Sequence, residues 1–232
     1  MMPCRKLGPA ANGLLVAALL FFAALQAAAA ADTYDLLFRT GTLDGLSRET
    51  PLTYERRVSA RANEQIADRE TGTVRLDFAP EDMAVLTFRQ GERHRTIGSF
   101  PAKVGNPLIL YFVESIVRDM ATTAGGSPYY IRNRIKAALE QDNPVREEIL
   151  ETDDGSIEVT TVTLQPFRND PNKDRMKGFG DLKLTVRMSE QIPGWYYQLQ
   201  AEAPAGPKTD GDAEQTPVYA SSIRFRSKEM TE

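Results

Sequence analysis

A short segment rich in Asn and Asp carries side chains of the types that bind metal ions, at a suggestive spacing. Four residues fall at positions 1, 3, 5 and 12 of the frame that calcium loops use: Asp170, Asn172, Asp174 and Asp181. Oxygen ligands at alternate residues can surround one hard cation. Position 6, where a tight turn needs glycine, is Arg175, and position 12 lacks the usual glutamate. The pattern therefore favours a turn-rich hairpin loop, with a cation site as the alternative, and we expect no metal.

Catalytic side chains are sparse in this chain. His94 is the single histidine, and it could form a zinc site only with cysteine or clustered carboxylate ligands nearby in space. The chain contains no Gly-x-Ser-x-Gly elbow and no phosphate-binding loop. We therefore expect a protein with no catalytic residues and no cofactor, which is not an enzyme. A hydrolase would require His94 to meet a serine or a carboxylate in a cleft.

Aromatic and basic residues gather in the middle of the chain. They are Tyr111, Phe112, Tyr129, Tyr130, Arg132 and Arg134. Aromatic rings beside cations can form the mouth of a site for an amphiphile, since rings pack against an acyl chain and arginine pairs with an anionic head group. The alternative is that the rings belong to the core and the arginines to a solvated helix face.

The N-terminal residues 1–31 have the pattern of a cleaved secretory signal peptide. Arg5 and Lys6 precede an apolar stretch at 14–25, and an alanine run ends at Ala31. The apolar stretch is shorter than the ~20 residues of a membrane span, so we expect export without a stable membrane anchor. The only cysteine, Cys4, lies inside this segment. An exported chain without disulfides or glycosylation acceptors indicates the bacterial periplasm.

The net charge and the length of the chain limit its possible partners and its number of domains. The 232-residue chain has a net charge of −4, and loss of Arg5 and Lys6 makes the exported part more acidic, which argues against a nucleic-acid partner. Residues 32–232 predict one exported domain, because no linker separates two apolar regions. The polar segment 203–217 has no apolar period, and we expect a mobile loop there.

Alternation of apolar and polar residues predicts many strands. The clearest are 182–188 and 195–203, which a turn at Pro193 and Gly194 would join as a hairpin. In the second strand one face would carry Trp195, Tyr197, Leu199, Ala201 and Ala203. Shorter runs predict strands at 34–39, 52–58, 74–78, 84–88, 145–150 and 219–225. A change of phase within 157–164 predicts a bulge near Thr160 and Thr161.

Two helices are predicted between these strands. Asn106-Pro107 and Ser127-Pro128 each combine an N-cap residue with a proline in the first turn. The first helix would run to about Ala121 and would be ended by residues 122–126, where Gly125 or Gly126 can take the left-handed conformation that a helix stop requires. We expect the pair to form a helical hairpin across one face of a sheet.

The order of these elements resembles that of the LolA-like periplasmic lipoprotein and lipid carriers. In that family a curved antiparallel sheet forms an incomplete barrel, and helices cover an apolar cavity. By this resemblance 182–188 and 195–203 would supply the concave face and 108–139 the lid. One departure is that the helical pair forms a single block near the middle of the chain. The family also includes envelope-stress sensors, so the fold does not decide the function.

The predicted fold is α+β, mainly β: a curved antiparallel sheet, or incomplete barrel, with a central helical hairpin on one face. The predicted function is a periplasmic binding protein that shelters a hydrophobic or lipid-like ligand. Its ligand-binding residues would be Phe112, Ile116, Tyr130, Arg134, Trp195, Tyr197 and Leu199. A solid core of the same residues would leave no room for a ligand. The alternative function is a non-enzymatic envelope protein that docks a protein partner through a sheet edge or the lid.

Overall fold

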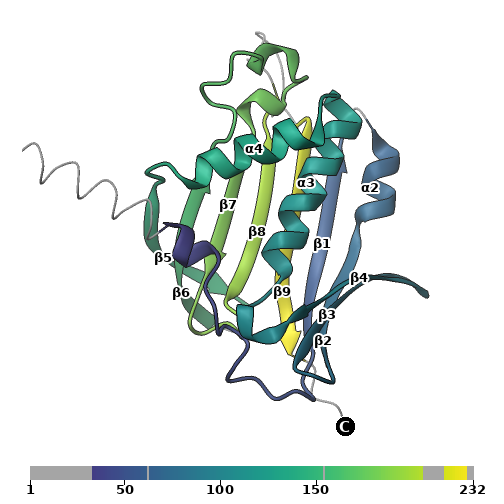
Figure 1. The fold of residues 1–232 in the computed structure, drawn as a ribbon, viewed down its shortest axis with the longest axis vertical. Helices are drawn as coiled ribbons and strands as arrows, with labels where there is room; N and C mark the ends of the chain where they lie inside the picture. The colour runs from purple at the N-terminus through teal and green to yellow at the C-terminus, as the bar shows by residue number, and fades with distance from the viewer. Residues whose placement is uncertain (1–32, 62, 154, 206–216, 229–232) are drawn as a thin grey trace, which may run out of the picture.

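The computed structural model describes residues 33–61, 63–153, 155–205 and 217–228 (Figure 1). The expected signal peptide at 1–31 lies outside these residues, as do residues 206–216 of the expected mobile loop. The two ends of that loop are adjacent, because the amide of Val218 donates a hydrogen bond of 3.0 Å to the carbonyl oxygen of Ala203.

All strands of the described residues belong to one antiparallel sheet with the order β4-β3-β2-β1-β9-β8-β7-β6-β5. The strands are β1 Leu52–Ala60, β2 Gly72–Ala79, β3 Met83–Gln90, β4 Arg93–Pro101, β5 Val145–Thr152, β6 Gly155–Leu164, β7 Lys183–Met188, β8 Tyr196–Ala203 and β9 Tyr219–Lys228. Consecutive strands pair with each other except β4 and β5, which lie at opposite edges of the sheet. Strand β9 pairs with β1 as well as with β8 and so joins the two halves. The sheet is open, with β4 and β5 at its edges, which confirms the α+β, mainly β class.

The helices are α2 Glu64–Glu70, α3 Leu108–Ala124 and α4 Pro128–Leu139, with a short helical segment at 33–37. The predicted start of α4 is confirmed, because Pro128 opens the helix after Ser127. Helix α3 begins one residue later than predicted, with Pro107 at the N-cap position, and Asn106 Oδ1 accepts a hydrogen bond of 3.0 Å from the amide of Leu108. Helix α3 ends at Ala124 and is followed by Gly125, whose φ of 82° suits glycine. Within the described residues no helix combines the length and apolarity needed to cross a bilayer.

One face of the sheet contributes to the main hydrophobic core. Alternate strand residues such as Leu76, Leu86 and Leu199 are fully buried and belong to the same cluster as Phe112 and Ile116 of α3. Figure 1 shows α3 and α4 in front of this face. Each large apolar side chain buried there contributes about 1.5–3 kcal/mol, so this packing is the main source of stability.

Several sequence predictions were wrong. Residues 33–37 are helical and not part of a strand, and Tyr34 stacks on Phe38 one helical turn later, with 4.8 Å between ring centroids. Strand β4 and helix α2 were missed. The predicted bulge near Thr160 and Thr161 is absent, because β6 keeps a continuous register with both β5 and β7 over these residues. Instead, Val159 and Val162 are both buried, on opposite faces of a regular strand.

Candidate functional site

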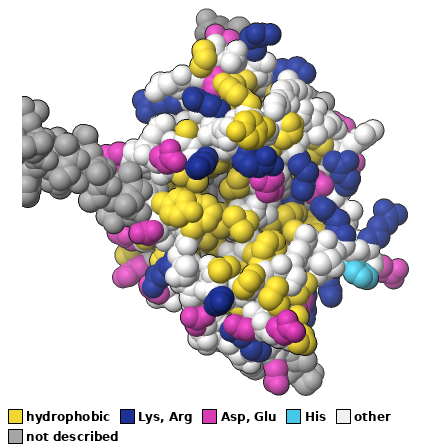
Figure 2. Space-filling model, viewed as in Figure 1, with side chains coloured by type: hydrophobic (Ala, Val, Ile, Leu, Met, Phe, Trp, Pro, Cys, Tyr) yellow, Lys and Arg dark blue, Asp and Glu magenta, His cyan; other side chains and the backbone are white. Residues whose placement is uncertain are grey.

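The turn between α3 and α4 borders a hollow of about 460 Å³. Its apolar walls come from the end of α3, the start of α4 and the facing segment 172–176, and they include Met120, Ala124, Ile131 and Met176. Met120, Ile131 and Met176 are themselves well buried, so the hollow is a recess in the packed surface. Figure 2 shows hydrophobic side chains grouped over this face of the molecule, with Lys and Arg side chains above and beside them.

One wall of the hollow is held in place by a buried carboxylate, Asp170. The Tyr130 hydroxyl donates to Asp170 Oδ2 at 2.7 Å, and Arg134 Nε lies 2.8 Å from the same oxygen. The backbone amide of Asn172 donates to the other oxygen at 2.8 Å. Burial alone would raise the pKa of Asp170, but these donors and the Arg134 charge hold it below its usual value. The ionised carboxylate therefore joins α4 to the segment 165–182.

These contacts also change the interpretation of the calcium-like frame. Asp170 is already bound by Tyr130 and Arg134, and Asp181 forms an ion pair of 2.6 Å with Lys173. Among the described residues no three His, Cys, Asp or Glu side chains come together as a metal site would require. The frame in the sequence therefore brings no such group together in the fold.

The seven residues proposed for ligand binding do not form one site. Phe112, Ile116 and Leu199 are at most 1% exposed, and all three belong to the hydrophobic core. These three side chains do not line the hollow at the α3–α4 turn. Tyr130 lines the hollow at the α3–α4 turn. Arg134 positions Tyr130 through their shared partner, Asp170.

Trp195 and Tyr197 lie in two further places. Trp195 donates from Nε1 to the carbonyl oxygen of Leu36 at 2.9 Å, and the Arg39 guanidinium lies 4.5 Å from its ring centroid. The register of β7 and β8 shifts at Met188, which pairs with Tyr196. Because of this bulge Tyr196 enters the core, whereas Tyr197 lies on the other face of the sheet beside Arg224. The prediction that Tyr197 shares a face with Leu199 was therefore wrong.

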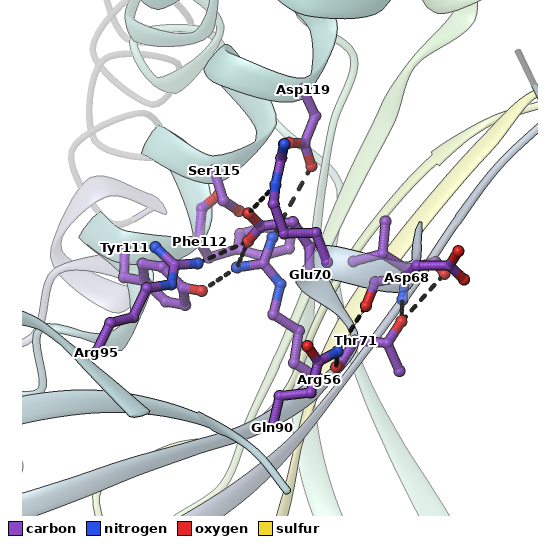
Figure 3. A network of polar contacts seen from close by, with 12 residues as sticks. Arg56, Asp68, Glu70, Thr71, Gln90, Arg95, Tyr111, Phe112, Ser115 and Asp119 are labelled. Atoms are coloured by element: carbon purple, nitrogen blue, oxygen red, sulfur yellow. Dashed lines mark hydrogen bonds and ion pairs between the residues drawn. The ribbon is translucent and has the colours of Figure 1, made fainter. Parts of the chain in front are cut away.

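A buried charge network that was not predicted from the sequence lies between α3 and the sheet (Figure 3). Its centre is Arg56 of β1, whose side chain is fully buried. Arg56 Nη1 donates to the Tyr111 hydroxyl and lies 3.3 Å from Glu70 Oε2, and Nη2 lies 3.9 Å from Asp119 Oδ2. The signal was present in the sequence, since Arg56 shares the parity of Leu52, Tyr54 and Val58 in an inward-facing strand.

Burial dominates the electrostatics of this network. Asp119 accepts a hydrogen bond of 2.7 Å from the Tyr219 hydroxyl, yet desolvation still raises the pKa of its carboxyl. Desolvation likewise raises the pKa values of Tyr111 and Tyr219. Arg95 extends the network toward the surface through an ion pair of 2.9 Å with Glu70. Residues from β1, β4, β9, α2 and α3 thus meet at one point, which ties the long helix to the sheet.

His94 lies exposed on the edge strand β4, opposite Arg89 of β3. Within the described part of the chain no serine or carboxylate makes a hydrogen bond or ion pair with it. The arrangement thus lacks the oriented partner that a catalytic histidine needs.

Comparison with known proteins adds no assignment. The chain matches no protein-family model, and no curated protein is significantly similar to it in sequence.

Proposed function

We propose that this protein binds a hydrophobic or lipid-like ligand in the periplasm, and that the apolar part of the ligand occupies the hollow at the α3–α4 turn. The observation that supports this proposal is the hollow itself. Its volume of about 460 Å³ lies within the range of about 300–1,000 Å³ typical of small-molecule sites. Met120 and Met176 suit an apolar ligand of variable shape, because methionine side chains are flexible and polarisable.

The polar groups of the hollow favour an amphiphile over a purely apolar ligand. Arg175 lies exposed at its border and can pair with an anionic head group. The Tyr130 hydroxyl is committed to Asp170, so the face of its ring is the part available to a ligand. Arg134 acts on the site only by positioning Tyr130.

The LolA-like arrangement, with α3 and α4 as a lid over a curved sheet, is the finer form of this proposal. Phe112 and Ile116 of α3 and Leu199 of β8 are buried in the core, so a ligand between helix and sheet would require α3 to move. The network around Arg56 opposes that movement. The α3–α4 turn offers an entry that leaves this packing intact.

Native mass spectrometry of protein purified from a periplasmic extract without detergent tests the proposal. We expect an extra mass that solvent extraction removes, and uptake of palmitate by the extracted protein. Ala124→Trp fills the hollow and should abolish uptake, whereas Leu110→Trp, at a 45% exposed site elsewhere on α3, should leave it unchanged. A clean mass with no uptake of palmitate or phosphatidylglycerol would refute the proposal.

A second candidate function is the docking of an envelope protein through a sheet edge. It is favoured by edge strand β5, where the apolar side chains of Val145 and Ile149 are 43% and 67% exposed. A photoreactive residue at Ile149 should then give one discrete crosslinked species in cells, and the same residue at Tyr129 should not. A smear equal to that from Tyr129 would argue against docking at β5.

A further inference from the structure

Two hollows adjoin on the sheet near β5, β6 and β7. The first, of about 420 Å³, is bordered by Arg146 of β5 and by Thr161 and Thr163 of β6. The second, of about 430 Å³, continues toward Lys173 and Asp181. Three residues, Gln165, Arg168 and Lys183, line both hollows, so the two form one continuous groove, which we call the outer groove.

The outer groove lies on the face of the sheet opposite the main core. Val162, Leu184 and Val186 belong to the core cluster, and their strand neighbours Thr163 and Lys183 therefore point the other way. Figures 1 and 2 view the molecule from the helix side, so the groove is turned away from the viewer. It is separate from the hollow at the α3–α4 turn, with which it shares no lining residue.

Cations of the outer groove are largely unneutralised. Arg146, Arg168 and Lys183 are all exposed, and among the described residues none of their side chains forms a hydrogen bond or ion pair. Lys173 is paired with Asp181 at 2.6 Å. Arg146, Arg168 and Lys183 therefore line one hollow as unpaired cations, although the chain as a whole has a net charge of −4.

Carboxylates near the outer groove do not cancel this charge. Asp142 is the one further acidic residue that lines it. Glu202 lies opposite Lys183 in the register of β7 and β8, without an ion pair between them. Glu148 is already engaged by the Thr161 hydroxyl and by Arg187 Nε, which lies 3.4 Å away. An anion entering the groove would therefore meet more positive than negative charge.

The remaining lining identifies the class of ligand. Thr163, Thr185 and Gln165 supply hydroxyl and amide groups that can hydrogen-bond to polyol oxygens. Arginine and lysine are the side chains that bind phosphate and carboxylate groups. We propose that the outer groove binds a sugar-sized polyol carrying two or more phosphate or carboxylate groups, either free or as the head group of a lipid.

Isothermal titration with inositol trisphosphate at physiological salt tests this proposal. We expect saturable binding that uncharged inositol does not show. Arg168→Gln/Lys183→Gln should weaken it at least tenfold. The matched double variant Arg93→Gln/Lys136→Gln removes the same charge from β4 and α4 and should change it less than twofold. Absence of binding at millimolar ligand, or equal weakening in both double variants, would overturn the proposal.

Circular dichroism melting of both double variants controls for folding, since all four side chains are exposed. Co-sedimentation distinguishes the two sources of the ligand. Binding to phosphatidylcholine vesicles only when they contain phosphatidylinositol 4-phosphate, and its loss in Arg168→Gln/Lys183→Gln, would support a lipid head group. Binding of free inositol trisphosphate without vesicle binding would support a free phosphorylated polyol.

Discussion

Removing the positive charge of Arg56 should be among the most destabilising single changes in this protein. In Arg56→Met the side-chain volume is roughly kept, but Asp119 loses its nearest cation in a buried site where its side chain is only 4% exposed. Loss of one partner from a buried ion pair typically costs about 3–5 kcal/mol. Glu70 retains Arg95 at 2.9 Å, so we expect the lower end, about 3 kcal/mol.

Two matched variants separate the network from general effects of the substitution. Arg57→Met changes the neighbouring residue, whose side chain is 68% exposed and pairs with Glu55 at the surface, and should cost less than about 1 kcal/mol. Arg56→Met/Asp119→Asn removes the orphaned charge but keeps an acceptor for the Tyr219 hydroxyl. It should recover about 1–3 kcal/mol of the loss.

Urea denaturation followed by far-ultraviolet circular dichroism at pH 7 measures these differences, provided that the m-values of the variants agree. The reasoning fails if Arg56→Met costs no more than Arg57→Met. It also fails if the double variant is less stable than Arg56→Met alone, because the charge on Asp119 would then not be the source of the destabilisation.

Four further predictions concern Asp119 and three more polar side chains. Folding raises the pKa of Asp119, so the folded protein holds the carboxyl proton more tightly than the unfolded chain does. The contribution of Asp119 to stability therefore falls as pH rises from about 4 through the raised pKa. Urea titrations across pH should show this slope in the wild type and a flatter curve in Asp119→Asn. The pKa of Asp170 is lowered on folding, so its contribution is lost as pH falls, and acid unfolding of Asp170→Asn should begin from a lower stability but depend less on pH. Tyr130→Phe deletes one hydrogen bond to the ionised Asp170 and should cost about 1.5–3 kcal/mol in thermal unfolding; an unchanged Tm would show that Arg134 suffices. Asn106→Ala removes the cap of α3 and the hydrogen bonds of 2.9 Å to Tyr54 Oη and 2.8 Å to the Gly194 carbonyl oxygen. The free energy of unfolding should fall by about 2–4 kcal/mol. A fall below about 1 kcal/mol would contradict the role of Asn106 in joining α3 to β1 and to the turn at Gly194.

Local patterns sufficed for most elements. Alternation located the strands that became β7 and β8, and Asn106-Pro107 located the start of α3, because side-chain parity and capping act between residues close in sequence. The error at 34–39 has a tertiary cause. The same apolar residues suit a short helix that buries Leu37, and the fold selected the helix.

Sequence alone determined the mainly β class, the two long helices and the acidic charge. Only the tertiary structure decided which of these residues meet. A bulge opposite Met188 moved Tyr197 to the other face, since one extra residue reverses the side-chain parity of a strand. Arg56 and Asp119 are 63 positions apart in the printed sequence, yet packing of α3 on β1 brings them together in a buried network. The outer groove likewise combines Arg146, Arg168 and Lys183 from separate segments, because its charge depends on strand pairing and not on any local run of basic residues.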